Sequence, residues 1–329
     1  MNFLSLDRQA MARALSMGEA IEALRQALAP AMADGVQVPP RTIMTLGDSA
    51  ESNQVLVMPA ALPLAQAVAV KVSTITPDNP RHGRPLIHAL VILLSSQTGE
   101  ILALMEGAHL TALRTGAMAG LATDLLARPA SRVLAVIGAG VQARSQIEAV
   151  CAVRPIEQLL LHSRSLDKAR ALAAWVSDRG LCPQVMVTDS VARAVRMADV
   201  ICTATSTASA EPLVRAADVR PGTHINAIGG VDEMACEIDP LLLGQSAVYV
   251  EERDAALREA GELIQSLRLG VLMPGDVQEI ASLLGGSVVP RGTASSLFKS
   301  VGTAIQDVAV AAALLRSART KGLGTRVSL

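Results

Sequence analysis

The sequence predicts an α/β protein with a parallel sheet, and three observations support this prediction. In the second half of the chain, short apolar runs mostly alternate with helical patterns, which is typical of βαβ units. One of these runs leads into a glycine turn with G-x-G-x-x-A spacing, directly before a helical pattern. The chain has 329 residues and is half apolar, so it is long enough for two domains or one large one.

The composition excludes several classes of function. The net charge is only −1, and with one Trp, one Tyr and two Phe there is little to stack on bases, so no nucleic-acid partner is expected. Neither a signal peptide nor an apolar run long enough to span a bilayer is found, so we expect a cytoplasmic protein without a membrane partner. The histidines lack ligand spacing, and no metal is expected. Four scattered cysteines suit a reducing compartment: Cys151, Cys182, Cys202 and Cys236.

The first half of the chain mixes helices with a hairpin. A helix over residues 16–35 begins with Ser16 and Glu19 in capping-box spacing, with a kink expected at Pro30 and an end near Gly35. Apolar and alternating runs predict strands at 41–46, 54–59 and 66–75. A hairpin turning at 97–99 follows over residues 89–107, and then a long helix over 108–128.

After Pro129 the pattern changes to that of a parallel sheet. Strands are predicted at 132–137, 158–162, 184–188, 199–203, 223–228 and 247–250. A last long helix is expected over roughly residues 295–318, where it could return to pack on the N-terminal part.

The glycine turn "VLAVIGAGVQARSQ" (133–146) predicts a nucleotide pyrophosphate on a helix N-terminus. Gly138 permits the tight turn, Gly140 lets the backbone approach the phosphates, and Ala143 serves the helix–strand packing of the third glycine. Val141 and Gln142, the first residues of the helix, are further candidate cofactor contacts. An ordinary glycine-bearing turn is the alternative interpretation.

The end of the next strand indicates which cofactor is used. An NAD site usually has an Asp or Glu here for the ribose 2′-hydroxyl, whereas this chain has Ser163, Arg164 and Ser165. An arginine flanked by hydroxyls could bind a 2′-phosphate, so NADP(H) is expected to be preferred, with NAD(H) possible. A solvated arginine that starts a helix is the alternative.

Lys71 is a candidate for substrate chemistry. Strand alternation places it on one face with Ala67, Ala69 and Ser73, which suits a pocket with small walls. A buried ammonium there needs an anionic partner or a lowered pKa, and a substrate carboxylate would be that partner. Taken alone, a lysine snorkelling from a sheet edge is the simpler interpretation.

Several segments together resemble the ornithine cyclodeaminase/mu-crystallin family. They occur in the family's order over most of the chain: "PPRT" (39–42), "LVMPA" (56–60), "AVKVST" (69–74), "TGEILALMEG" (98–107), "LTALRTGAMAGLA" (110–122), "VIGAGVQARSQ" (136–146), "INAIGG" (225–230) and "SLFKSVGTAIQD" (296–307). The resemblance implies a Rossmann domain (117–303) inserted in a second α/β domain (1–116 plus 304–329), which binds substrate and forms homodimers.

The resemblance also implies roles for individual residues. Arg41, Lys71 and Arg114 match the family's carboxylate-binding positions, and the lysine is also the family's proton donor or acceptor. Thr115 matches a residue that contacts the cofactor phosphates. In ornithine cyclodeaminase an Asp directly follows the glycine pair, whereas Val231 stands here, with Asp232 one residue late.

The leading hypothesis is an NAD(P)H-dependent reductase of a small cyclic imino acid such as Δ1-pyrroline-2-carboxylate. The absence of the Asp disfavours ornithine cyclodeamination, an NAD-dependent lyase reaction that nevertheless stays open. An alanine- or opine-type dehydrogenase also stays open, as does a non-catalytic, NADPH-binding protein similar to mu-crystallin.

Overall fold

The computed structural model describes residues 2–29, 34–47, 52–206, 209, 211–230, 233–287 and 294–328. The chain folds into two compact units. Unit 1 comprises Met1–Arg114 and Thr303–Leu329, and unit 2 comprises Thr115–Gly302. Helix α3 (Gly107–Leu126) crosses the boundary between them. No helix among the described residues has the length and apolar character needed to cross a membrane.

Unit 1 is built on a seven-stranded sheet of order β15-β1-β6-β5-β4-β3-β2. All neighbouring pairs are antiparallel except β1 and β6. The strands are β1 (Asn2–Leu6), β2 (Thr42–Leu46), β3 (Asn53–Leu62), β4 (Ala67–Ile75), β5 (Ile87–Ser95), β6 (Ile101–Glu106) and β15 (Thr325–Ser328).

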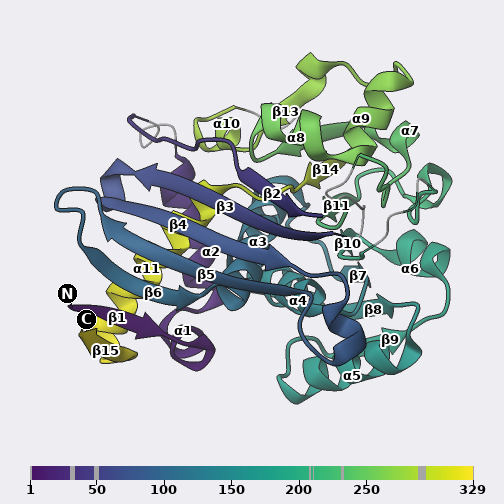
Figure 1. Ribbon diagram of the computed structural model, residues 1–329. Helices are drawn as coiled ribbons and strands as arrows, with labels where there is room; N and C mark the ends of the chain where they lie inside the picture. The colour runs from purple at the N-terminus through teal and green to yellow at the C-terminus, as the bar shows by residue number, and fades with distance from the viewer. Residues whose placement is uncertain are drawn as a thin grey trace. The chain divides into compact units, whose positions relative to one another are not determined.

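One face of this sheet is covered by helix α11 (Ala304–Lys321), which packs on β3, β4 and β5 (Figure 1). Helices α1 (Arg8–Ala14) and α2 (Met17–Leu28) pack on α11 in turn. As the alternation predicts, the buried face of β4 carries Ala67, Ala69, Lys71 and Ser73. The small alanine side chains let the helix approach the sheet closely.

The opposite face of the sheet is apolar but only half-buried. Its side chains alternate with the buried ones along each strand and belong to Val57, Val68, Val70, Val72, Ile92, Leu94 and Leu104. A contiguous β-branched and leucine face of this kind is unusual on an exposed surface and is typical of an interaction site.

Unit 2 contains an eight-stranded parallel sheet of order β13-β12-β14-β11-β10-β7-β8-β9. Its strands are β7 (Val133–Ile137), β8 (Gln158–His162), β9 (Gln184–Val187), β10 (Val200–Thr203), β11 (His224–Ala227), β12 (Ser246–Val250), β13 (Val277–Glu279) and β14 (Ser295–Lys299). Its helices are α4 (Val141–Val153), α5 (Leu166–Asp178), α6 (Val191–Met197), α7 (Pro240–Leu243), α8 (Arg253–Glu259), α9 (Gly261–Arg268) and α10 (Ala281–Leu284).

The strands of unit 2 bury both faces, and the middle of β7 shows how. Leu134 and Val136 join a core with residues of α4 and α5, whereas Ala135 and Ile137 join a second core with residues of α6, α8 and α9. Helices on both faces of a parallel sheet form the doubly wound arrangement expected for a Rossmann domain. The predicted fold class is confirmed.

Two element predictions are wrong. The last helix begins at Ala304, because residues 295–299 form the strand β14 between β11 and β12. The helix that begins after Ser16 ends at Leu28, since Ala29 precedes a proline and adopts an extended ψ of 137°. Pro30 itself lies outside the described residues. The short elements β1, α1, β13 and β15 were not predicted from the sequence.

Candidate functional site

The glycine turn of unit 2 has the geometry expected of a nucleotide-binding turn. Gly138 has a φ of +123°, and a Cβ at this position would collide with the carbonyl of Ala204 at the end of β10. Its N–H donates to the carbonyl of His162 at 2.8 Å, so the turn is tied to the end of β8. Only glycine satisfies both the dihedral angle and the close approach.

The N-terminus of α4 is open to an anion. Gly140 is the N-cap residue, and no side chain of the described residues caps the helix or accepts from the N–H groups of its first turn. A Cβ built on Gly140 would meet no atom of the described residues within 4 Å apart from its chain neighbours, and Val141 is 63% exposed. Uncapped N–H groups beside open space fit the pyrophosphate of a dinucleotide.

The loop after β8 contains the three residues expected to select the cofactor. The Ser163 hydroxyl accepts from the backbone N–H of Ser165 at 3.3 Å, and the Ser165 hydroxyl caps α5 by accepting from the N–H of Lys168 at 3.4 Å. Arg164 between them is exposed, and no described residue pairs with its guanidinium. The loop therefore offers an unpaired cation just after the strand that contacts Gly138.

Unit 1 contains a buried cluster of opposite charges. One carboxylate oxygen of Asp307, on α11, lies 2.8 Å from Nζ of Lys71, and the other lies 3.1 Å from Nε of Arg114. Arg114 also donates from Nη1 to Oε1 of Gln306 at 2.6 Å. Lys71, Arg114 and Asp307 are only 4%, 6% and 1% exposed, respectively. Three charges held this deep indicate a built site rather than solvated surface side chains.

The surroundings lower the pKa of Lys71 to about 8. Burial is the largest cause, because desolvation disfavours the charged form, and the positive charges of Arg114 and Arg41 act in the same direction. The Asp307 carboxylate opposes them through its charge and its hydrogen bond. A lysine with such a pKa can exchange a proton near neutral pH.

Three predicted residues therefore gather in unit 1. Lys71 and Arg114 share one carboxylate, and Arg41, which directly precedes β2, is close enough to affect the pKa of Lys71. Thr115 follows Arg114 on α3 and is buried. The candidate cofactor residues Gly138, Gly140, Val141, Gln142, Ser163, Arg164 and Ser165 lie in unit 2 at the ends of β7 and β8.

Asp307 and Gln306 were not predicted from the sequence. A substrate carboxylate was expected to be the anionic partner of Lys71, whereas the protein supplies its own carboxylate from α11. A signal was present, because these are two adjacent polar residues at the start of a run, 304–315, that is otherwise apolar. Gln306 and Asp307 are both buried, as are their apolar neighbours.

A second buried cluster, also not predicted, fixes the backbone after β11. The Glu237 carboxylate accepts from the N–H of Gly229 at 2.9 Å and from the hydroxyl of Thr203 at 2.7 Å. The Lys299 ammonium donates to the carbonyl oxygens of Gly229 at 2.5 Å and Gly230 at 2.9 Å. This glycine pair is thus held from both sides at the carboxyl end of the parallel sheet. Val231 and Asp232, which follow it, lie outside the described residues.

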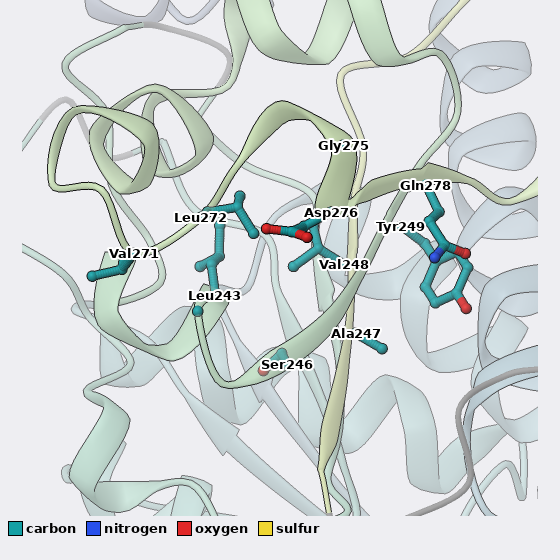
Figure 2. A pocket seen from close by; sticks show the side chains of 11 residues that line it. Leu243, Ser246, Ala247, Val248, Tyr249, Val271, Leu272, Gly275, Asp276 and Gln278 are labelled. Carbon is teal, nitrogen blue, oxygen red and sulfur yellow. The ribbon is translucent and has the colours of Figure 1, made fainter.

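A cavity of about 360 Å³ lies elsewhere in unit 2, at the beginning of β12 (Figure 2). It is lined by eleven residues between 243 and 278, including Leu243, Leu272 and Asp276, and by none of the predicted site residues. It opens at the start of a parallel strand, whereas nucleotides bind at the carboxyl ends of such strands. Within the described ranges, no group of three His, Cys, Asp or Glu side chains could hold a metal ion.

Comparisons with known proteins agree with this geometry. The chain is 34% identical over 317 residues to Δ1-pyrroline-2-carboxylate reductase of Bacillus cereus, which covers 95% of this chain and 96% of the relative. The fold of this chain is similar to that of Thermococcus litoralis Δ1-pyrroline-2-carboxylate reductase in complex with NADH and L-proline. The TM-score is 0.91, the identity is 35%, and the match covers 99% of this chain and 100% of the other.

A second similar structure is an archaeal alanine dehydrogenase dimer with bound NAD, with a TM-score of 0.89, 32% identity and full coverage of both chains. The model of the ornithine cyclodeaminase/mu-crystallin family matches residues 3–322. The chain therefore belongs to the ornithine cyclodeaminase/mu-crystallin family.

Proposed function

We propose that this protein is an NAD(P)H-dependent reductase that converts a small cyclic imino acid, such as Δ1-pyrroline-2-carboxylate, into the cyclic amino acid. The observation that carries the proposal is the buried cluster of Lys71, Arg114 and Asp307. It combines cations for a carboxylate with a lysine whose pKa is near 8. The similar reductases named above act on this class of substrate.

Arg114 and Lys71, together with Arg41, would bind the substrate carboxylate. Among the described residues no acceptor pairs with Nη2 of Arg114, and Lys71 makes a single ion pair with one of its three protons. Donors therefore remain for a second carboxylate beside that of Asp307. Holding the carboxylate fixes the orientation of the adjacent C=N bond, and orientation can lower a barrier by several kcal/mol.

Lys71, or a water that it holds, would supply the proton. The ammonium donates to the imine nitrogen, and the protonated imine is the better hydride acceptor. Bound NAD(P)H would supply the hydride that adds to the imine carbon. Lys71 is then neutral and takes a proton back from solvent, which a pKa near 8 allows at neutral pH.

We further propose that unit 2 binds the cofactor and prefers NADPH. The uncapped N-terminus of α4 and the open space at Gly140 fit the pyrophosphate, with Val141 and Gln142 in the first turn and Thr115 as a further phosphate contact. Arg164, with the hydroxyls of Ser163 and Ser165 beside it, would pair with the 2′-phosphate.

Unit 1 would bind substrate and form a homodimer through the apolar, half-buried face of its sheet. The four cysteines carry free thiols, which suits the cytoplasm.

The test is a screen of NADPH and NADH oxidation against cyclic imines and against 2-oxo acids with amines. Oxidation of NADPH with a cyclic imino acid is expected, and the cyclic amino acid should be the product by mass spectrometry. Ammonia release from ornithine without net cofactor turnover would instead identify a cyclodeaminase. Turnover only with 2-oxo acids would identify a dehydrogenase of the alanine or opine type. Cofactor binding without turnover of any compound would contradict the proposal.

A further inference from the structure

Asp307 contacts both cations of the proposed substrate site. Its two carboxylate oxygens are divided between them, with Oδ2 at 2.8 Å from Lys71 and Oδ1 at 3.1 Å from Arg114. The carboxylate is 1% exposed, and Oδ2 has no hydrogen bond donor among the described residues besides the ammonium of Lys71. A carboxylate buried to this degree is tolerated only because both cations compensate it.

We propose that Asp307 is a positioning residue for imine reduction: it holds Lys71 beside Arg114 and keeps Lys71 in its ammonium form until the proton is transferred. The inference rests on the proposed function. Asp307 need not touch the substrate for this role, because it acts through the lysine. Without its charge, two buried cations would face each other with no anion to offset their repulsion.

The neighbourhood of Lys71 makes Asp307 the one nearby anion among the described residues that stabilises the ammonium. The groups that act on it are Arg114 from α3 and Arg41 from the segment before β2, which disfavour the charge, and Asp307 from α11, which favours it. On the neighbouring strands, the residues paired with Lys71 are Met58 and Val91, and neither titrates. Removing the carboxylate charge can therefore change the pKa of Lys71 in one direction only: the pKa falls further below about 8.

The first experiment compares the pH profile of kcat/KM for the parent and for Asp307→Asn, which is nearly isosteric. In the parent, the rate should fall as the pH rises through about 8, because Lys71 loses the proton that it donates. In Asp307→Asn this fall of the rate at alkaline pH, the alkaline limb of the profile, should occur at a pH that is lower by about one unit or more. Asp307→Glu, which keeps the charge, should return the limb toward the parental position. An unchanged limb in Asp307→Asn would overturn the inference.

Gln306→Leu is the matched control, because it removes the neighbouring hydrogen bond to Arg114 but leaves the charge of Asp307. It should raise KM without moving the alkaline limb. A limb that moves equally in Gln306→Leu would show that general loosening of α11, rather than the carboxylate, causes the shift, and would also overturn the inference.

A double variant covers the case in which Asp307→Asn does not fold. Lys71→Met with Asp307→Asn removes one cation and the anion together, so the buried net charge is unchanged. If Asp307 acts through Lys71, this variant should have the same residual turnover as Lys71→Met alone. A further drop of tenfold or more would mean that Asp307 acts on the substrate directly, against the inference.

A measurement without turnover separates this inference from the proposed function. The chain has only four lysines: Lys71, Lys168, Lys299 and Lys321. In NMR spectra of protein labelled at lysine Cε, the signal that is missing from Lys71→Met therefore belongs to Lys71, and its titration can be followed. The titration midpoint of Lys71 should fall in Asp307→Asn by the same shift as the kinetic limb. A parent that reduces no imine would refute the proposed function, whereas an unshifted midpoint would refute only the role of Asp307.

Discussion

At the scale of single residues, Lys71 allows the sharpest test of the proposed chemistry. Lys71→Met should lower imine reduction by at least roughly a hundredfold, which is the usual range for losing an acid–base group. The fold should survive, because the Asp307 carboxylate still pairs with Arg114 at 3.1 Å. Steady-state kinetics and thermal unfolding check both expectations. Loss of folding would show that Lys71 is a structural pair member, and near-parental turnover would show that the pocket is assigned wrongly.

Arg114→Met should behave differently from Lys71→Met, because Arg114 binds but does not transfer a proton. We expect KM for the imino acid to rise roughly tenfold or more, the cost of losing a charged hydrogen bond, while kcat changes less. Some loss of cofactor affinity is also expected, since Thr115 is adjacent. A fall in kcat with an unchanged KM would contradict the assignment of Arg114 to carboxylate binding.

Arg164 tests the choice of cofactor. The parent should use NADPH better than NADH, and Arg164→Asp should reverse this preference, because a carboxylate repels a 2′-phosphate and accepts from a 2′-hydroxyl. The change in the ratio of kcat/KM values should be about tenfold or more. Arg170→Asp is a suitable control, because Arg170 is also exposed but lies on α5 beyond the loop. Equal use of both cofactors by the parent would contradict the prediction.

The buried position of Lys71 in the proposed substrate site could be predicted at the residue scale, but its counter-ion could not. Strand alternation places Lys71 on a small, buried face, and the structure confirms that face. Asp307 lies 193 residues beyond Arg114 along the chain, and no local sequence pattern can predict a contact between residues so far apart in the sequence. Its position at the start of an apolar helix marks it as unusual, but only the tertiary fold identifies its partners.

At the scale of elements, the two glycines of the turn before α4 should respond differently to alanine. Gly138→Ala should destabilise the protein by about 1–3 kcal/mol or more, because its φ is +123° and a Cβ would collide with the Ala204 carbonyl. Gly140→Ala should cost less, about 0.5–1 kcal/mol, because alanine is a poorer N-cap than glycine, whereas its Cβ would meet no atom of the described residues within 4 Å apart from its chain neighbours.

Gly140→Ala should nevertheless weaken cofactor binding by roughly tenfold or more, because the methyl group would occupy the space of the pyrophosphate. Calorimetric titration with NADPH measures the loss of cofactor affinity, and thermal unfolding measures the loss of stability. Parental affinity in Gly140→Ala would show that the pyrophosphate does not approach this backbone.

The earlier strands of unit 2 were predicted with more accurate bounds than its last strands, since β13 was not predicted and β14 was predicted as part of a helix. The predicted strands at 158–162 and 184–188 match β8 and β9 to within one residue, because each is a short apolar run between polar loops. The residues of β14 run on toward the apolar sequence of α11 with only four residues, 300–303, between the strand and the helix, so the period of the pattern alone could not separate the two. The N-terminal β1 and α1 are too short for a periodic signal.

At the scale of the whole molecule, the half-buried face of unit 1 predicts a homodimer. Val70 lies in the middle of that face, between Pro59 on β3 and Ile92 on β5. Val70→Asp should raise the dimer dissociation constant by about a hundredfold or more, because it would bury an unpaired carboxylate. Light scattering at micromolar concentration checks this, with Met186→Asp on β9 of unit 2 as a matched control. A parent that is monomeric would refute the prediction.

The discontinuity of unit 1 has a consequence for how the protein is made. Unit 2 is encoded without interruption, so it can fold while the ribosome is still adding residues, as domains generally do. Unit 1 has to wait, because α11, which covers the buried face of its sheet, follows the whole of unit 2 in the chain. During that interval the strands that precede unit 2 lack the helix that covers them, and exposed apolar surface of this kind makes a nascent chain prone to aggregation. Asp307, which completes the buried charge cluster, is thus synthesised only after all of unit 2, so a product whose translation stops within unit 2 cannot form that cluster.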